Sequence, residues 1–225
     1  MARFDRLTVY NTIVHDGMIP LFYNPDLEVA KQIVEALYDG GSRVLEFTNR
    51  GDFAIEVFGA LVKHCVTAHP DMVIGIGTVD DAPTAALYIA YGANFIVSPT
   101  FNPDVARLCN RRKIAYMPGC GDLNDIAIAE ESGVEIVKLF PGSTSGGPAF
   151  VKAVLAARPM SRIMPTGGVT PEEDNLRGWF DAGVVCVGMG SKLVRKDWIQ
   201  AGDFEKVENG THNALKLIQS IRTEK

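Results

Sequence analysis

The chain alternates short apolar runs with longer stretches of helical periodicity, and this pair of patterns occurs eight times. The short runs have the length of strands, and the longer stretches have the length of helices. The predicted strands are Met18–Phe22, Arg43–Thr48, Met72–Ile76, Asn94–Ser98, Ile114–Met117, Glu135–Phe140, Arg162–Pro165 and Val184–Val187. The predicted helices are Asp26–Tyr38, Phe53–Ala68, Ala82–Tyr91, Pro103–Arg112, Leu123–Glu131, Pro148–Ala157, Pro171–Asp181 and Asp203–Ile221.

Residues that favour helix ends stand at the borders of these helices. Asn24-Pro25-Asp26 and Asn102-Pro103-Asp104 each offer a capping side chain, a proline and an acid for a first helical turn. Gly92, Gly133 and Gly183 follow predicted helices, where glycine readily adopts the left-handed conformation that ends a helix. These signals support the predicted boundaries.

The predicted strands are continuously apolar rather than alternating, which is typical of a parallel sheet covered on both faces. Eight strand–helix units without a proline- or glycine-rich linker predict one α/β domain over residues 1–225, a (β/α)8 TIM barrel. Residues 1–17 and the segment after Ser191 are expected to be short flanking helical elements of that domain. A doubly wound sheet is the alternative, but the dinucleotide fingerprint fails at Asp80, where its third glycine belongs, and the chain has no GxxxxGK[ST] loop.

Composition narrows the classes of function. The 225 residues include 27 acidic and 22 basic side chains, for a net charge of −5. An acidic chain whose one compact basic run is Arg111–Lys113 is not expected to bind nucleic acid. No stretch approaches the roughly 18 uninterrupted apolar residues of a membrane span, and the first residues lack the apolar core of a signal peptide. We therefore expect a cytoplasmic protein without a membrane partner.

The cysteines and histidines show no metal-binding or disulfide spacing. The chain contains no CxxC pair and no HExxH motif, so the sequence predicts reduced thiols and no histidine metal site. The residues concerned are Cys65, Cys109, Cys120, Cys186, His15, His64, His69 and His212.

Two charged residues interrupt predicted buried strands. Glu46 lies within Arg43–Thr48, and Lys138 lies within Glu135–Phe140. A buried charge is expensive unless it is paired, and alternate strands of a barrel contribute to one interior layer, so the two side chains can meet inside. They form either a self-satisfied ion pair or a lysine nucleophile with a carboxylate acid/base. Burial lowers the pKa of an amine, which then attacks a carbonyl to form a Schiff base.

Further polar residues follow the predicted strands. Arg50, four residues after Glu46, is either a solvated charge or a guanidinium that grips a carboxylate through two hydrogen bonds. Thr78 is either a turn residue or a hydroxyl donor to the same carboxylate. Pro165–Val169 and Gly188–Ser191 are glycine-rich and follow the seventh and eighth predicted strands, where barrels bind phosphate. A helix beginning at Ser191 would add its dipole to that site.

Five motifs in order along residues 18–200 resemble those of the KDPG/KHG aldolases, the class I pyruvate aldolases. These enzymes cleave 2-keto-3-deoxy-6-phosphogluconate (KDPG) or 4-hydroxy-2-oxoglutarate (KHG). The motifs are Val44–Arg50 (VLEFTNR), Gly75–Val79 (GIGTV), Ser98-Pro99, Val137–Pro141 (VKLFP) and Pro165–Val169 (PTGGV). The resemblance implies a (β/α)8 barrel, usually a homotrimer, that needs no metal or organic cofactor. Its partners would be a 2-keto-3-deoxy sugar acid and pyruvate.

Roles for individual residues follow from the resemblance. Lys138 would form the Schiff base, and Glu46 would be the general acid/base. Arg50 and Thr78 would hold the pyruvoyl carboxylate. The residues that would line the pocket are Pro99 and Phe140, and those that would bind the phosphate are Gly167, Gly168 and Ser191.

Three loops at the expected mouth depart from the family pattern, and they limit what the resemblance implies about the aldehyde half of the substrate. These loops contain Gly119–Asp125, Gly142–Gly147 and the pair Met189 and Lys192. Lys192 either adds charge to a phosphate site or is a solvated residue of a helix. A sugar-phosphate epimerase and a non-catalytic barrel that binds a phosphorylated metabolite remain alternative functions.

Overall fold

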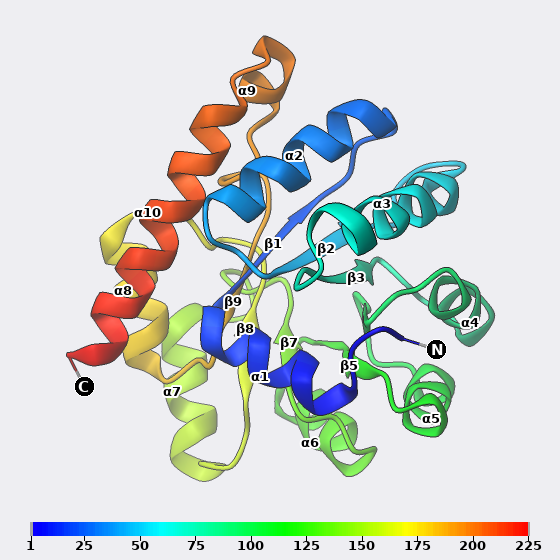
Figure 1. Ribbon diagram of the computed structural model, residues 1–225. Helices are drawn as coiled ribbons and strands as arrows, with labels where there is room; N and C mark the ends of the chain where they lie inside the picture. The colour runs from blue at the N-terminus through cyan, green and yellow to red at the C-terminus, as the bar shows by residue number, and fades with distance from the viewer. Residues whose placement is uncertain (1, 225) are drawn as a thin grey trace.

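The computed structural model describes residues 2–224, whose elements surround one parallel barrel (Figure 1). Within these residues the strands are β1 (Met18–Phe22), β2 (Val44–Thr48), β3 (Val73–Gly77), β4 (Phe95–Val97), β5 (Ala115–Met117), β6 (Gly119–Cys120), β7 (Val137–Leu139), β8 (Ile163–Pro165) and β9 (Val187–Met189). The helices are α1 (Arg6–Asp16), α2 (Leu27–Asp39), α3 (Ala54–Ala68), α4 (Ala82–Ala90), α5 (Pro103–Arg112), α6 (Leu123–Glu131), α7 (Gly147–Ala157), α8 (Glu173–Ala182), α9 (Lys196–Ala201) and α10 (Phe204–Thr223).

The strands pair in the order β5-β4-β3-β2-β1-β9 and, in a second group, β6-β7-β8, with every pair parallel. The two groups join into one ring. β5 and β6 are one barrel strand interrupted at Pro118, which has no N–H to donate to a neighbouring strand. On the other side, a parallel bridge between Thr166 and Gly188 connects the ends of β8 and β9. The nine segments therefore occupy eight barrel positions, and the predicted (β/α)8 barrel is confirmed.

Most helices begin and end where the sequence predicts. Asn102 accepts hydrogen bonds from the N–H groups of Asp104 and Val105, so it caps α5 as expected. Gly92, Gly133 and Gly183 all have positive φ angles of 82° to 103°, as the helix-ending role requires.

Two predicted boundaries near the C-terminus are wrong. The last strand, β9, starts three residues later than predicted, because its ladder with β1 begins only at the pair Met18 and Val187. The expected helix at Ser191 is absent from the described chain: the N–H groups of Leu193 and Val194 both return to the Gly190 carbonyl in a turn. The next helix, α9, starts at Lys196 and has only 6 residues. No helix dipole is therefore aimed from Ser191 at the predicted phosphate site.

The N-terminal flank closes one end of the barrel. Val9 and Ile13 of α1 belong to the same buried cluster as inward-facing strand residues such as Val44 and Phe95. Tyr10 adds polar contacts, since its hydroxyl accepts the Tyr116 N–H at 3.1 Å. Figure 1 shows α1 lying across the strands at this end.

The C-terminal helix α10 completes the outer layer by packing between α2 and α8 (Figure 1). Its buried face contains Val207, Ala214, Ile218 and Ile221. No helix within residues 2–224 is both long enough and apolar enough to cross a bilayer.

Candidate active site

The period of two along a strand brings the predicted charged pair into one interior layer. Val44 and Ile136 face the interior of the barrel, in the cluster that α1 closes. Glu46 and Lys138 each lie two residues further along their strands, so they face inward one layer closer to the open end. Both are buried, with exposed fractions of 2% and 6%.

Glu46 occupies space that a glycine leaves free. Its carboxylate lies against Gly77 of β3, where an added Cβ would collide with Oε1. The other oxygen, Oε2, is buried and has no hydrogen-bond partner within residues 2–224. Burial raises the pKa of Glu46, and the charges of Lys138 and Arg50 partly oppose that rise. A carboxyl group in this position exchanges protons closer to neutral pH than an exposed glutamate does.

Lys138 carries a buried amine beside an aromatic ring. Its pKa is lowered by burial and by the Arg50 charge, against the opposite effect of Glu46. The amine lies 4.8 Å from the centre of the Phe140 ring, and it makes no ion pair or hydrogen bond with any residue from 2 to 224. Because Lys138 and Glu46 are not in ion-pair contact, the arrangement does not fit a self-satisfied structural pair. It leaves the amine available for a ligand.

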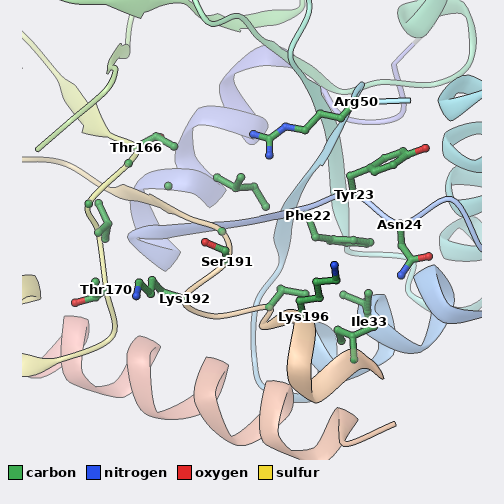
Figure 2. Close-up of a pocket in the computed structure, with 18 of the residues that line it drawn as sticks. Phe22, Tyr23, Asn24, Ile33, Arg50, Thr166, Thr170, Ser191, Lys192 and Lys196 are labelled. Atoms are coloured by element: carbon green, nitrogen blue, oxygen red, sulfur yellow. The ribbon is translucent and has the colours of Figure 1, made fainter. Parts of the chain in front are cut away.

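A cleft of about 790 Å³ opens at the carboxyl ends of the strands. Figure 2 shows Arg50 on one side of this cleft and Ser191, Lys192 and Lys196 on other parts of its wall. Of the described residues that line it, the charged ones are all cationic, namely Arg50, Lys192 and Lys196. Such a lining attracts a ligand that carries more than one negative charge.

The structure brings most of the predicted binding residues to this cleft. Those that line it are Arg50, Phe140, Gly167, Gly168 and Ser191. Pro99 lies instead in a neighbouring cavity of about 340 Å³, which shares Phe140 with the main cleft. Thr78 lines neither cavity, but it directly follows the glycine that contacts Glu46 and has a φ of +61°. A positive φ at threonine is strained, and such strain is concentrated at functional sites.

The predicted phosphate loop, Pro165–Val169, is hydrogen-bonded to the loop that follows β7. The N–H groups of Gly142 and Ser143 donate to the carbonyls of Thr166 and Gly167 at 2.8 and 3.0 Å. Gly167 and Gly168 have φ angles of 88° and 79°, which glycine adopts without strain. Their own N–H groups donate to no other residue in the described chain, so they are free to bind an anion at the cleft wall.

Two lining residues were not singled out from the sequence. Thr166 has a buried Oγ1 without a partner among residues 2–224, and it faces inward because it stands two residues after Met164. The same period of two could have identified it. Lys196 begins the short helix α9, and its approach to the cleft depends on the turn at Gly190, for which the sequence offered no signal.

The barrel and this site are typical of one class of protein: enzymes with a buried reactive lysine and a glycine-rich loop at the carboxyl ends of the strands. The model of the "KDPG and KHG aldolase" family matches residues 9–210, and the chain belongs to this family. It is accordingly an aldolase, a lyase that breaks a carbon–carbon bond.

Individual relatives agree with this assignment. The 2-dehydro-3-deoxy-phosphogluconate aldolase of Treponema pallidum is 32% identical over 94% of this chain and 98% of the relative. The KHG/KDPG aldolase of Escherichia coli K12 is 29% identical over 88% of this chain and 91% of that enzyme. Among solved structures, KDPG aldolase from Legionella pneumophila has a TM-score of 0.83 and 27% identity, covering 90% of this chain and 96% of that one. That structure holds pyruvate as a covalent carbinolamine.

Proposed function

We propose that this aldolase uses a Schiff base on Lys138 to cleave KDPG to pyruvate and glyceraldehyde 3-phosphate, KHG to pyruvate and glyoxylate, or both. The observation that carries the proposal is the buried amine of Lys138, which pairs with no other described residue. It lies 4.8 Å from the ring centre of Phe140, and Phe140 lines a cleft whose charged lining residues are all cationic. Both substrates are multiply charged anions with a ketone beside a carboxylate. Their negative charges are attracted by the cationic lining of the cleft, and their ketone is the electrophile that the Lys138 amine attacks.

Arg50 and Thr78 hold the substrate carboxylate, while Pro99 and Phe140 flank the pyruvoyl group. The Lys138 amine attacks C2, and the resulting carbinolamine loses the ketone oxygen as water to give an iminium. Glu46 then removes the C4 hydroxyl proton, and the C3–C4 electron pair moves toward the iminium nitrogen. This step releases the aldehyde and leaves an enamine. Protonation at C3 and hydrolysis then release pyruvate and restore the amine.

The raised pKa of Glu46 suits this role. A group that takes a proton in one step and returns one in another works best when its pKa lies near the working pH. Burial shifts the pKa of Glu46 upward and that of Lys138 downward, so both move toward neutrality. The two shifts favour a neutral amine and a proton-exchanging carboxyl group in one buried layer.

At the other end of the substrate, the phosphate of KDPG binds the N–H groups of Gly167 and Gly168 and the hydroxyl of Ser191. Lys192 and Lys196 add positive charge to the same wall. KHG has a carboxylate and no phosphate, so it depends less on these residues. Relative activity on the two substrates therefore reports how much this wall contributes.

We place the protein in the cytoplasm as a homotrimer in the Entner–Doudoroff breakdown of sugar acids. Support for assembly comes from apolar side chains that the single chain leaves in water. Phe53 is 74% exposed, and Leu87, Leu123 and Ile128 are 42% to 50% exposed. Light scattering is expected to give three times the chain mass of 24.4 kDa.

Pyruvate release tests the proposed reaction directly. The purified protein is assayed with KDPG and with KHG, and pyruvate is reduced by lactate dehydrogenase to follow NADH consumption. Wild type is expected to turn over at least one substrate, Lys138→Met neither, and Glu46→Gln about 10²- to 10⁴-fold more slowly. Binding of sugar phosphates to the folded protein without any pyruvate release would instead favour the non-catalytic barrel.

A further inference from the structure

Outside the cleft, one cluster brings two histidines and a carboxylate together between neighbouring helices. Glu35 lies on α2, His64 lies on α3, and His69 is the residue that caps the C-terminus of α3. α2 and α3 pack side by side on the outside of the barrel (Figure 1). Helices run antiparallel to the strands in this fold, so the end of α3 lies away from the carboxyl ends of the strands, where Arg50 lines the cleft.

Both imidazole rings point at the same carboxylate. The Nε2 atom of His64 is 2.7 Å from Glu35 Oε1, and the Nε2 atom of His69 is 2.8 Å from Glu35 Oε2. One ligand atom from each of the three residues can be chosen so that all lie within 4.8 Å of one another. Two nitrogen atoms and a carboxylate oxygen at this separation can converge on a single ion after small side-chain movements.

The ring of His69 is held in place before any ligand arrives. It stacks on Tyr38 with ring centres 4.0 Å apart, and the Tyr38 hydroxyl donates to Asp71 at 2.8 Å. The Arg43 guanidinium covers Tyr38, 4.0 Å from its ring centre. The Nδ1 atom of His69 is buried without a partner in the described chain, so the contact with Glu35 is what orients the polar edge of the ring.

Solvent reaches the cluster from one side. The side chain of His69 is 7% exposed, whereas those of His64 and Glu35 are 26% and 41% exposed. A site with one buried and two partly open ligands admits an ion and leaves a coordination position for water. This donor arrangement, with three protein ligands and an open position, is one that Zn²⁺ accepts.

We infer that Glu35, His64 and His69 form a binding site for one divalent transition-metal ion, with Zn²⁺ as its representative, at the interface of α2 and α3. Imidazole nitrogen favours Zn²⁺ and its transition-metal neighbours, whereas Mg²⁺ and Ca²⁺ prefer an all-oxygen shell. The spacing of the histidines in the sequence gave no such indication, because Glu35 comes from a different helix.

Metal binding requires each Nε2 atom to be free of its proton. Because a carboxylate only accepts hydrogen bonds, the Nε2 atom is assigned as the donor in both contacts with Glu35. A metal-bound Nε2 carries no proton. A neutral ring keeps its proton by moving it to Nδ1, whereas a doubly protonated ring releases its Nε2 proton to solvent. The ion then replaces two hydrogen bonds with coordinate bonds between α2 and α3. It stabilises the fold and takes no part in aldol cleavage.

Isothermal titration of tag-free, EDTA-treated protein with ZnCl₂ tests the site, and Co²⁺ absorption reports its coordination. The expected result is one ion per chain, with no comparable heat from MgCl₂. Glu35→Gln and His64→Gln should each weaken Zn²⁺ binding by at least about 100-fold, beyond the usual effect of losing an outer-shell partner. His212→Gln is the matched control, because His212 is exposed on α10 and is not a member of the cluster, and this variant should bind like wild type.

A second readout is independent of both titration heat and catalysis. Zn²⁺ at 100 times its dissociation constant should raise the thermal midpoint of wild type by about 5–10 °C, and that of the two cluster variants by much less. Circular dichroism and pyruvate release in EDTA establish that the variants fold. The inference is overturned if wild type binds no stoichiometric ion, or if folded Glu35→Gln and His64→Gln bind as tightly as wild type. The cluster would then be a hydrogen-bonded bridge between helices.

Discussion

Replacing Gly77 by alanine adds a single methyl group at the point where the Glu46 carboxylate rests. The three atoms nearest to the new Cβ all belong to the Glu46 side chain. The backbone of Gly77 is not in the positive-φ region, so alanine is compatible with the strand itself. The substitution therefore displaces one side chain and leaves the rest of the layer in place.

The size of the effect follows from how far the carboxylate must move. An ordinary van der Waals contact requires about 3.5 Å, so Glu46 has to retreat by about 1 Å or more. A misplacement of about 1 Å typically costs 10²-fold in rate, or about 2.7 kcal/mol of activation free energy. The stability effect is smaller, because a flexible side chain yields and alanine reduces the freedom of the unfolded chain. We expect the free energy of unfolding to change by about 1 kcal/mol or less.

Gly75 supplies the matched control on the same strand. There, the added Cβ would collide with the ring of Phe95, which is fully buried and has no room to retreat. Overpacking of this kind destabilises by about 1–3 kcal/mol, which corresponds to a loss of about 2–12 °C in thermal midpoint. Gly75→Ala is thus expected to lose stability, whereas Gly77→Ala is expected to lose activity.

Steady-state kinetics on KDPG or KHG and differential scanning calorimetry distinguish the two outcomes. Gly77→Ala should keep its thermal midpoint within about 4 °C of wild type, lose about 10²-fold in kcat, and still form an imine with pyruvate, because the three atoms nearest to the new methyl group belong to Glu46 and not to Lys138. Wild-type kcat in folded Gly77→Ala would show that the position of the Glu46 carboxylate does not govern turnover.

Three further predictions concern other parts of the site. In a Glu46→Gln background, Lys138→Met should raise the thermal midpoint at neutral pH. Burial lowers the folded-state pKa of Lys138, so the protonated lysine destabilises the fold. This destabilisation is complete below the folded-state pKa and decreases as pH rises toward the unfolded-state pKa of about 10.4. Calorimetry should find that the difference in thermal midpoint between Glu46→Gln with and without Lys138→Met narrows as pH rises. A constant difference would contradict a lowered pKa of Lys138. Arg50→Lys should raise KM about 10-fold for KDPG and KHG alike, because lysine lacks the two-pronged grip on a carboxylate; an unchanged KM in initial-rate assays would remove Arg50 from that role. Lys196→Met should raise KM for KDPG about 5-fold and KM for KHG by less, since KHG has no phosphate; equal changes for both substrates would count against a phosphate contact.

The sequence predicted the barrel because local chemistry and tertiary structure agree along most of the chain. Asn102 caps a helix in any context, and buried parallel strands need continuous apolar runs. The predicted boundaries were wrong where pairing with a distant part of the chain determines where an element begins. The eighth strand begins at Val187 because β1 begins at Met18, and an apolar run marks burial without revealing the pairing register.

In the candidate site, too, some residues could be found from the sequence and others could not. Glu46 and Lys138 could be found because a charge inside an apolar run conflicts with its surroundings, and such conflicts mark functional positions. Lys196 lacked any such signal, since an exposed lysine at the start of a helix is ordinary. The cluster around Glu35 was also hidden, because its three members come together only when α2 packs against α3.

The central claim is that Lys138 forms a covalent imine with pyruvate. The most direct measurement is intact and peptide mass spectrometry after incubation with pyruvate and borohydride, beside Lys138→Met as the control. We expect one reduced pyruvyl group per chain, located on the peptide that contains Lys138 and missing from the variant. A folded wild-type protein that releases pyruvate from substrate yet acquires no adduct on this peptide would contradict the Schiff-base mechanism.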